Sequence, residues 1–146
     1  MAEPAKQPPK AILKLISKLN VLVYRLSGGR LMNTLMGSPI CLVTMTGRKS
    51  GRSITMPLMY TAHGDNVLIV ASLGGAPQHP VWYRNLVANP KVTIQQGGRL
   101  RPMTARQASP QEKAELWPTC VASYPAFADY QARTERDIPV MICEPV

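Results

Sequence analysis

The chain has 146 residues, and its 17 lysines and arginines against 8 acidic residues give a net charge of +9. This length suits one domain with a buried core, and the charge favours a polyanionic partner: nucleic acid, an anionic membrane or a highly charged small molecule. Nucleic acid is not expected, because Phe127 is the sole phenylalanine and no basic ribbon alternates with exposed aromatics. Cys41, Cys120 and Cys143 match no metal-binding spacing, so we expect no metal and reduced thiols in a cytoplasmic protein.

An amphipathic helix is expected near the N-terminus. Residues 1–9 carry proline and lysine and predict a disordered tail. From Ala11 to Leu26 apolar residues recur at intervals of three and four, and Ser27-Gly28-Gly29 suits a helix C-cap, so 10–29 forms the helical segment and 30–146 the main domain. Lysines interrupt the run, which excludes a secretory signal or a bilayer span. Two roles fit this helix: a cover for the domain, or attachment to the cytoplasmic face of an anionic membrane.

The rest of the chain has mainly the pattern of β-strands. The predicted strands are Pro39–Thr46, Ser53–Ala62, Val67–Ser72, Lys91–Gln96, Arg99–Arg106 and Pro139–Glu144. The predicted helices are Val81–Ala88, a segment from the Ser109–Glu112 capping box to about Trp117, and Phe127–Glu135. Pro118 is expected to disturb the second helix. Pro57 cannot donate to a ladder, so we expect its strand to be interrupted there, by a structural bulge or at a bound ligand. The fold class is therefore mainly β (α+β), a small barrel with helices packed outside.

Two glycine-bearing turns are candidate anion sites. Between the first two strands, Gly47 and Gly51 free the backbone so that N–H groups can converge, and Arg48, Lys49 and Arg52 add positive charge. The second turn, residues 73–80, places Gly74-Gly75 before the N-terminus of a short helix, a position that suits phosphate. For each turn taken alone, a solvated hairpin or a plain strand-to-helix connection is the alternative.

Several motifs follow one another in a specific order. They are Thr46–Gly51, Pro57-Leu58, Gly64-Asp65, Ala71–Gly75, Pro80–Leu86 and Ala88–Pro90, with Tyr124-Pro125, Tyr130, Ile138-Pro139 and Cys143–Pro145 towards the end. This set resembles the deazaflavin (coenzyme F-420)-dependent nitroreductase family, whose fold is a split β-barrel of the FMN-binding superfamily. The resemblance covers nearly the whole chain. It implies a split β-barrel with flanking helices and the N-terminal helix, and F-420 as the cofactor, with FMN as the alternative.

The resemblance also implies a cofactor site. Its expected residues are Arg48, Lys49, Arg52, Pro57, Ser72, Leu73, Gly74, Gly75, Trp82, Tyr83 and Asn85. The cationic turn would meet the acidic tail or phosphate, the Pro57 and Ser72–Gly75 backbone would line the ring and linker, and the last three residues would form the other wall. Ile54 and Thr55 stand where the family often has a basic residue, and Leu73 replaces a lysine that would contact phosphate.

The implied substrate site is largely aromatic. Its residues are Met59, Ser72, Tyr124, Phe127 and Tyr130, with Tyr124 and Tyr130 as candidate catalytic hydroxyls. Met59 and Phe127 stand where family tyrosines occur, which favours quinones and α,β-unsaturated ketones over nitro compounds. Ordinary core packing is the alternative for these aromatics.

No nucleophile or acid–base pair is evident, since neither His63 nor His79 has a visible partner. A hydride-transfer enzyme needs chiefly a well-placed cofactor. The first hypothesis is therefore an F-420H2-dependent reductase of a small-molecule quinone or enone, with nitroaromatics as further acceptors. The others are an F-420- or FMN-binding membrane-surface protein with little catalysis, and an FMN oxidoreductase on the same fold.

Overall fold

The computed structural model describes residues 10–31, 33–35 and 37–146, so the predicted N-terminal tail lies outside the described residues. The helices are α1 (Lys10–Leu26), the 3-10 turn η1 (Leu73–Gly75), α2 (Val81–Ala88), α3 (Pro110–Ser123) and α4 (Ala126–Arg133). The strands are β1 (Thr34–Leu35), β2 (Ser38–Thr46), β3 (Ser53–Met59), β4 (Thr61–His63), β5 (Asn66–Val70), β6 (Lys91–Gln96), β7 (Arg99–Gln107) and β8 (Val140–Pro145).

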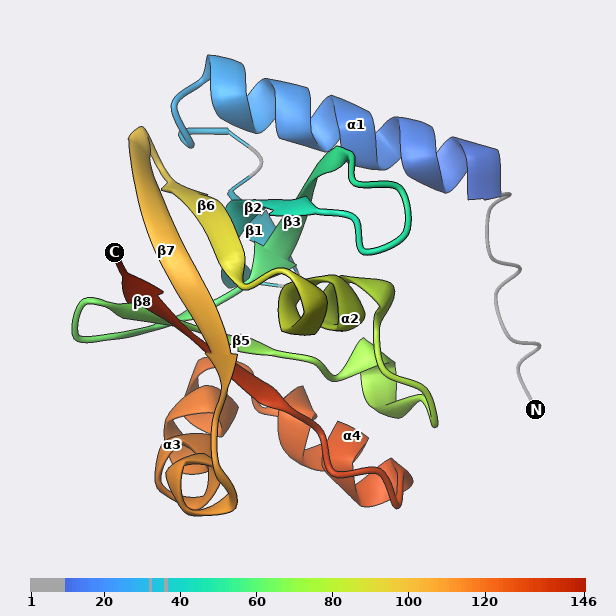
Figure 1. Cartoon of the computed structure of the whole chain (residues 1–146), viewed down its shortest axis with the longest axis vertical. Coiled ribbons are helices and arrows are strands. Elements are labelled where there is room, and N and C mark those ends of the chain that lie inside the picture. The colour runs from blue at the N-terminus through green and yellow to red at the C-terminus, as the bar shows by residue number, and fades with distance from the viewer. Residues whose placement is uncertain (1–9, 32, 36) are drawn as a thin grey trace.

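The strands form one antiparallel sheet that curls into a split barrel (Figure 1). Their order is β1-β2-β6-β7-β8-β5-β4, and β3 pairs with the other side of β2. The interruption expected at Pro57 is not found, because the β2–β3 register runs unbroken through the Leu42–Pro57 pair. Within the described strands β3 pairs with β2 alone, so Pro57 lies on an edge strand, where a missing N–H is tolerated. β3 contacts β5 without pairing to it, and this is where the barrel is split.

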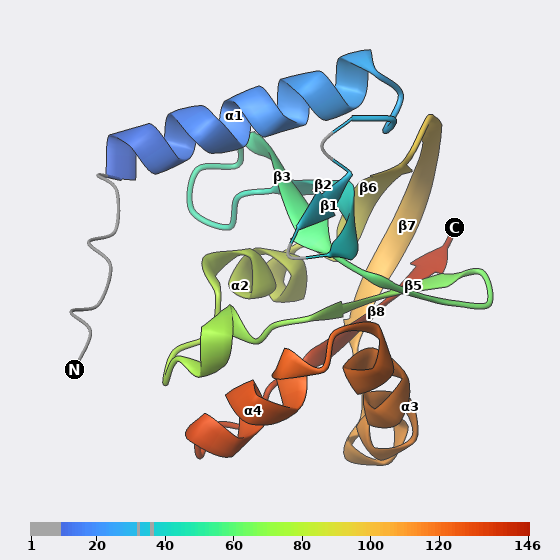
Figure 2. The ribbon, with the colours of Figure 1, turned by 180° about the vertical axis from the view of Figure 1, so that it is seen from behind.

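The barrel interior is the main core. It contains the inward side chains of β2, β5, β6, β7 and β8 together with Trp82 and Leu86 of α2. Cys41, Cys120 and Cys143 are buried and unpaired, as expected, and burial raises the pKa of Cys143 to about 12. A second cluster joins the outer face of β5 and β8 to α3 and α4, which lie together below the sheet (Figure 2).

Two of the predicted boundaries are wrong. The predicted strand Ser53–Ala62 is two strands, because β3 ends at Met59 and β4 then turns away to pair with β5. The helix predicted to end near Trp117 continues through Pro118 to Ser123. Pro118 is exposed, whereas residues on both sides of it pack on the second cluster, so tertiary contacts hold the helix across the lost hydrogen bond.

Helix α1 crosses the top of the barrel above β2 and β3 (Figures 1 and 2). Tyr24 is 1 % exposed, packs on Ile40 and Leu42, and accepts a 2.7 Å hydrogen bond from Gly97 N. The apolar stripe that predicted the helix points elsewhere. Its leucines and isoleucine remain at least half exposed: Leu15, Ile16, Leu19, Leu22 and Leu26. The helix covers the sheet through one face and presents its apolar stripe to the outside.

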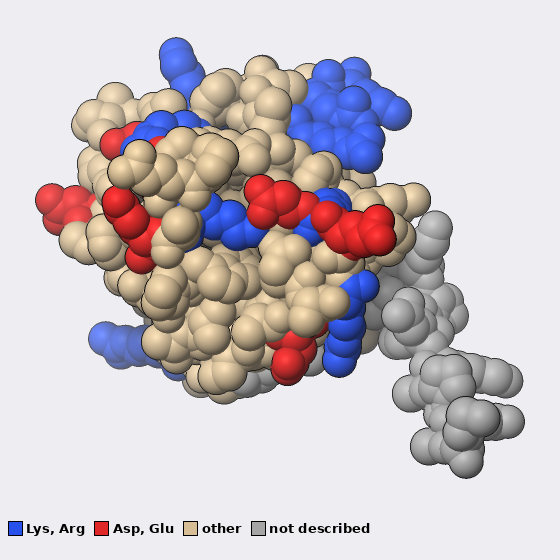
Figure 3. Space-filling model, turned by 90° about the horizontal axis from the view of Figure 1, so that it is seen from below, with Lys and Arg blue, Asp and Glu red and all other residues tan. Residues whose placement is uncertain are grey.

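Ion pairs gather around α3. Arg106 bonds Glu112 and Glu144, and Lys113 bonds Asp137 at 2.6 Å. Seen from the α3–α4 side, red and blue side chains lie together across the surface, while another basic group stands at one edge without acidic neighbours in view (Figure 3). Within the described part of the chain, no ion pair involves the three cations of the 47–52 turn.

The Arg106–Glu112 pair predicts an acid-sensitive contribution to stability. Hydrogen bonds from Arg106, and then from the Ser109 backbone, lower the pKa of Glu112 from 4.5 to about 2. Because the folded-state pKa is depressed, the stabilisation is complete above about pH 4.5 and is lost as pH falls towards 2. Arg106→Ala should therefore move the acid-unfolding midpoint to higher pH, measured by circular dichroism. Lys91→Ala removes one exposed cation elsewhere and should not; equal shifts would contradict this assignment.

Candidate cofactor and substrate site

The 47–52 turn between β2 and β3 is held in a fixed shape. Gly47 N donates to Arg52 O at 2.8 Å, and Gly51, with φ of 68°, donates to Gly47 O at 2.9 Å. Arg48 N donates to the side-chain oxygen of Asn85 at 3.1 Å, which ties the turn to α2. Asn85 is 4 % exposed and its amide also contacts the Met45 sulfur. The buried Asn85 therefore anchors a turn whose cations are exposed.

A hollow of about 240 Å³ lies beside this contact, between the turn and the first half of α2. Its lining residues are Gly47, Arg48, Lys49, Ser50, Ile54, Val81 and Asn85. Val81 is the first residue of α2, so the positive end of that helix faces the same space as the cations. An anion there would gain from two independent sources of positive potential.

The second predicted turn contains three successive residues in the left-handed region: Leu73 (φ 44°), Gly74 (64°) and Gly75 (80°). Ser72 before them is right-handed, at φ −78° and ψ −39°. A right-handed residue followed by a left-handed one turns consecutive N–H groups towards one point, the geometry of an anion nest. Leu73 is not a glycine, so its conformation is strained. The local geometry supports the phosphate interpretation of this turn.

Arg136, which follows α4, spans the back of this turn. It donates to the carbonyl oxygens of Ala71, Ser72 and Ala76 at 3.1, 2.8 and 3.0 Å, and to His79 Nδ1 at 2.9 Å. The expectation that His79 lacks a partner is therefore wrong. Because a guanidinium only donates, the neutral His79 ring carries its proton on Nε2. Burial, and then the charges of Arg136 and Arg84, lower the pKa of His79.

The residues predicted for the other wall divide into two groups. Tyr83 is half-buried, stacks on His79 with ring centroids 4.6 Å apart, and donates to Gln107 at 2.6 Å. Trp82 is 8 % exposed and packs in the barrel core, so it supports α2 from beneath. Pro57, which is predicted to line the cofactor ring, is half-buried on β3, where it pairs with Leu42 of β2.

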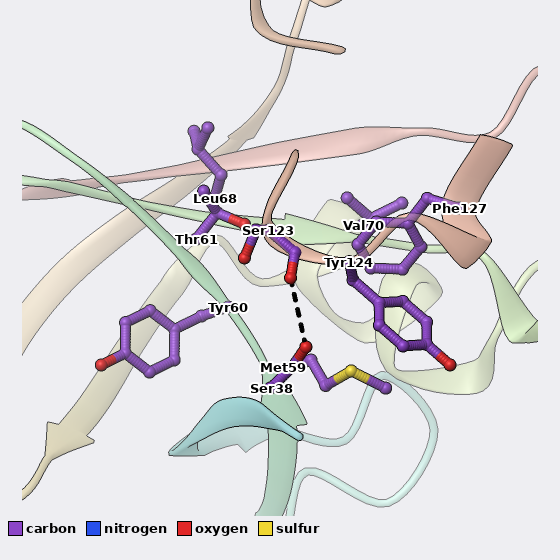
Figure 4. Close-up of a pocket in the computed structure, with 9 residues that line it drawn as sticks. All are labelled: Ser38, Met59, Tyr60, Thr61, Leu68, Val70, Ser123, Tyr124 and Phe127. Atoms are coloured by element: carbon purple, nitrogen blue, oxygen red, sulfur yellow. Dashed lines mark hydrogen bonds between the residues drawn. The ribbon is translucent and has the colours of Figure 1, made fainter. Parts of the chain in front are cut away.

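Three of the predicted substrate residues, Met59, Tyr124 and Phe127, meet between β3–β4 and the junction of α3 with α4 (Figure 4). Ser72 and Tyr130 do not line this pocket. This largely apolar slot is closed in the structure, with no room for a water molecule. Its lining residues are Ser38, Met59, Tyr60, Thr61, Leu68, Val70, Ser123, Tyr124 and Phe127. A hydrogen bond of 3.3 Å from Ser38 Oγ to Ser123 O joins its two sides. Met59, Tyr124 and Phe127 come together as expected, although Phe127 is 6 % exposed and also belongs to the core.

Tyr130 reaches the slot through Tyr124. The two hydroxyl oxygens are 3.2 Å apart, and the Phe127 ring packs edge-on against Tyr124 with centroids 4.9 Å apart. The hydrogen bond with Tyr130, and then burial, raise the pKa of Tyr124. Tyr124 therefore keeps its proton at neutral pH.

Trp82 lies in the core, and the structure places most of the other predicted residues in three parts: the cationic turn, the nest and the aromatic slot. Gly75 connects the last two, because a Cβ placed on it would lie 2.7 Å from Tyr130 O. Sequence reasoning missed Arg136, which lies 64 residues from Ser72 and has no motif of its own, and it missed Val81 and Ile54. A separate hollow of about 460 Å³ on β2, β6 and β7 contains none of the predicted site residues.

The donors present fit a polyanionic cofactor better than a metal. Exposed cations without ion pairs, a nest of N–H groups and a helix N-terminus all select negative charge. Within the described residues, no cluster of three histidine, cysteine or acidic side chains could hold a metal ion.

Comparison with known proteins agrees with this geometry. The sequence profile of the F420H(2)-dependent quinone reductases matches residues 16–145. The F420H(2)-dependent quinone reductase Rv1261c of Mycobacterium tuberculosis is 38% identical over 129 residues, 86% of this chain and 87% of its own length. Rv3178 of the same species is 45% identical over 107 residues, 73% of this chain and 90% of its own length.

A solved structure of an F420-H2 dependent reductase (FDR-A) superposes with a TM-score of 0.68 at 45% identity, covering 73% of this chain and 94% of that chain. HutZ of Vibrio cholerae, at 11% identity and a TM-score of 0.55, shares the fold alone. The family match spans the barrel, both glycine turns and the aromatic slot. The chain belongs to the F420H(2)-dependent quinone reductase family.

Proposed function

We propose that this protein is an F-420H2-dependent reductase that transfers a hydride to a quinone or an α,β-unsaturated carbonyl compound. The observation that carries the proposal is the unpaired cationic turn facing a hollow of about 240 Å³ at the N-terminus of α2. F-420 has a phosphodiester and an acidic glutamate tail, so this is the charge it requires. Family membership supports the same cofactor.

Each part of the site has a separate task in this scheme. Arg48, Lys49 and the Ser72–Gly75 nest bind the anionic tail and linker, and Asn85 fixes the turn that presents the cations. The bound deazaflavin supplies the hydride chemistry. The slot around Met59 and Phe127 excludes water and orients the acceptor. The Tyr124–Tyr130 pair holds a proton that can pass to the reduced oxygen.

FMN serves as the discriminating ligand, because it has one phosphate and no acidic tail. Titration of the protein with F-420 and with FMN should give tighter, more salt-dependent binding of F-420. Tighter binding of FMN would favour the flavin alternative. Tight F-420 binding without acceptor reduction would favour a carrier.

Acceptor choice should depend on the two tyrosine-like positions of the slot. Met59→Tyr with Phe127→Tyr adds hydroxyls beside the Tyr124–Tyr130 pair, where a polar nitro group could accept hydrogen bonds. A site that pairs polar substrate atoms discriminates more strongly than an apolar one. The double variant should therefore raise nitroimidazole reduction relative to enone reduction by about tenfold in kcat/KM. Equal changes for both substrates would show that these positions do not select the acceptor.

We also propose that α1 attaches the enzyme to an anionic membrane, where an isoprenoid quinone resides. The described part of the chain contains no helix long and apolar enough to cross a bilayer. Instead, α1 exposes its apolar stripe along one face, with Lys18 and Arg25 exposed on the same helix. This combination is typical of helices that lie in a lipid interface.

Replacing Leu15, Leu19 and Leu22 with glutamine should abolish co-sedimentation with anionic vesicles while menadione reduction persists. Burying one leucine contributes about 1.5–3 kcal/mol, so partitioning should fall at least about tenfold. The exposed pair Val87→Gln and Leu100→Gln is the control. The membrane proposal fails if the parent protein does not co-sediment with vesicles. If the triple glutamine variant then differs from the parent only in its sedimentation coefficient, a second copy of the chain covers α1.

A further inference from the structure

Arg136 is the most connected side chain of the site that no part of the proposed chemistry uses. It lies in the segment between α4 and β8, where its own N–H donates to Thr134 and its carbonyl accepts from Gln131. Its guanidinium donates to three carbonyl oxygens of the Ala71–Ala76 segment and to His79. One side chain therefore fixes both ends of the nest.

The nest requires such a support. Leu73 occupies a left-handed conformation at φ 44° although it has a Cβ and is 51 % exposed, so burial of its own side chain does not hold it there. Strained residues of this kind persist only where the surroundings over-determine them. Arg136 bonds the carbonyls of Ala71 and Ser72 before Leu73, and that of Ala76 after it. These carbonyls face the guanidinium, and two further hydrogen bonds, from Gly75 N to Ser72 O and from Ala76 N to Leu73 O, close the turn itself.

We propose that Arg136 is a positioning residue for cofactor binding, which holds the strained Ser72–Gly75 nest in its anion-binding shape and places a positive charge behind it. The proposal rests on the proposed function, because the nest is taken to meet the phosphate of F-420. It assigns to Arg136 the role of supporting the loop rather than contacting the reacting atoms.

The charge of Arg136 remains available to an anion. None of the ion pairs in the described part of the chain involves it, and Asp137, its neighbour in sequence, pairs with Lys113. Its fourth acceptor, His79, adds no negative charge, and burial, followed by the charges of Arg136 and Arg84, lowers the pKa of this histidine. Positive potential behind the nest therefore has no carboxylate to offset it among these partners, and it adds to the pull of the N–H groups.

The support can be tested on the free protein by amide hydrogen exchange. Gly75 N donates to Ser72 O and Ala76 N to Leu73 O, so these two amides report on the turn. In Arg136→Gln, which keeps neutral donors, and in Arg136→Ala, both should exchange at least about tenfold faster, while amides of the β6–β7 hairpin keep their rates. Arg99→Ala removes one exposed cation at that hairpin and serves as the control for net charge.

The link to the cofactor is tested by titrating the same variants with oxidised F-420. Arg136→Ala should weaken binding about tenfold or more, and Arg136→Lys should recover only part of it, since one ammonium cannot span three carbonyls. In a Leu73→Gly background, where the left-handed turn is unstrained, the loss caused by Arg136→Ala should be smaller. A double-mutant cycle measures this coupling.

Unchanged exchange at Gly75 and Ala76 in Arg136→Ala would overturn the proposal, and so would unchanged F-420 affinity or a cycle without coupling. Failure of the parent protein to bind F-420 would instead overturn the proposed function. Faster exchange in the variants would then still establish Arg136 as the support of the turn.

Discussion

Replacing Arg48 and Lys49 together with alanine should weaken F-420 binding at least about tenfold at low salt. Both side chains are exposed beside the hollow at α2, and neither has an ion pair within the described residues. Hydrogen bonds to charged groups contribute about 1.5–3 kcal/mol each, reduced here by solvent screening. The remaining affinity should also depend less on salt, because fewer charge pairs form. Isothermal titration at several salt concentrations measures both effects.

A matched control separates the local contact from the overall charge. Lys91→Ala with Arg99→Ala also lowers the net charge by two, but at exposed sites on β6 and β7 away from the predicted cofactor residues. This variant should keep the parent affinity. If both double variants lose affinity equally, the turn attracts the cofactor only through net charge and is not its binding site.

Gly75→Ala should be the most damaging single substitution near the site. Its Cβ would lie 2.7 Å from Tyr130 O and 3.1 Å from Tyr130 Cα, both backbone atoms that cannot turn aside. The left-handed φ of 80° adds roughly 1–2 kcal/mol of strain, and overpacking typically costs about 1–3 kcal/mol. We therefore expect a loss of about 2–5 kcal/mol in the free energy of unfolding, measured by urea denaturation. The affinity for F-420 and the rate of acceptor reduction should both fall, because the nest and α4 would move apart.

Gly74→Ala is the appropriate comparison for that experiment. Gly74 has a similar left-handed φ of 64°, but a Cβ there would meet nothing within 4 Å. Gly74→Ala should therefore lower the free energy of unfolding only by the cost of the left-handed conformation, roughly 1–2 kcal/mol. If the two alanine variants are equally stable, close approach of α4 does not position the nest, and the arrangement of the three site parts would need another explanation.

The sequence predicts most of the fold because its signals are local. The capping box at Ser109 and the hairpin around Gly97-Gly98 each follow from the chemistry of a few neighbouring residues. The failures concern competition with tertiary structure. Helix α3 crosses Pro118 because its packed residues outweigh one missing hydrogen bond. The apolar periodicity of α1 identifies a helix correctly but not the face on which it rests.

The orientation of α1 depends on a single aromatic residue. Tyr24 lies about 200° around the helix from Leu22, and its hydroxyl bonds the β6–β7 hairpin at Gln95 and Gly97. No periodicity calculation distinguishes one well-placed tyrosine from a stripe of leucines. The sequence therefore supports both roles considered for the helix; in the structure one face of α1 packs on the barrel and its described leucines lie exposed.

The candidate site shows the same contrast between local sequence signals and tertiary contacts. Among the residues within motifs, Arg48 and Asn85 line the hollow beside α2, and Gly75 lies in the nest against Tyr130. Arg136 could not be found in this way, because its function depends on carbonyl groups 60 to 65 residues away that carry no side-chain signal. Trp82 belongs to a motif, yet it contributes by filling the core beneath α2.

The central claim is hydride transfer from a deazaflavin held at the cationic turn to an acceptor held in the aromatic slot. An anaerobic single-turnover experiment, with protein in excess over reduced F-420 and menadione added, tests it most directly. We expect oxidised F-420 to form at a rate that saturates with menadione. At a protein concentration that saturates cofactor binding in the parent but not in Arg48→Ala/Lys49→Ala, the rate should be lower in the variant. Tight binding of reduced F-420 with no acceleration over the cofactor and menadione alone would contradict the claim.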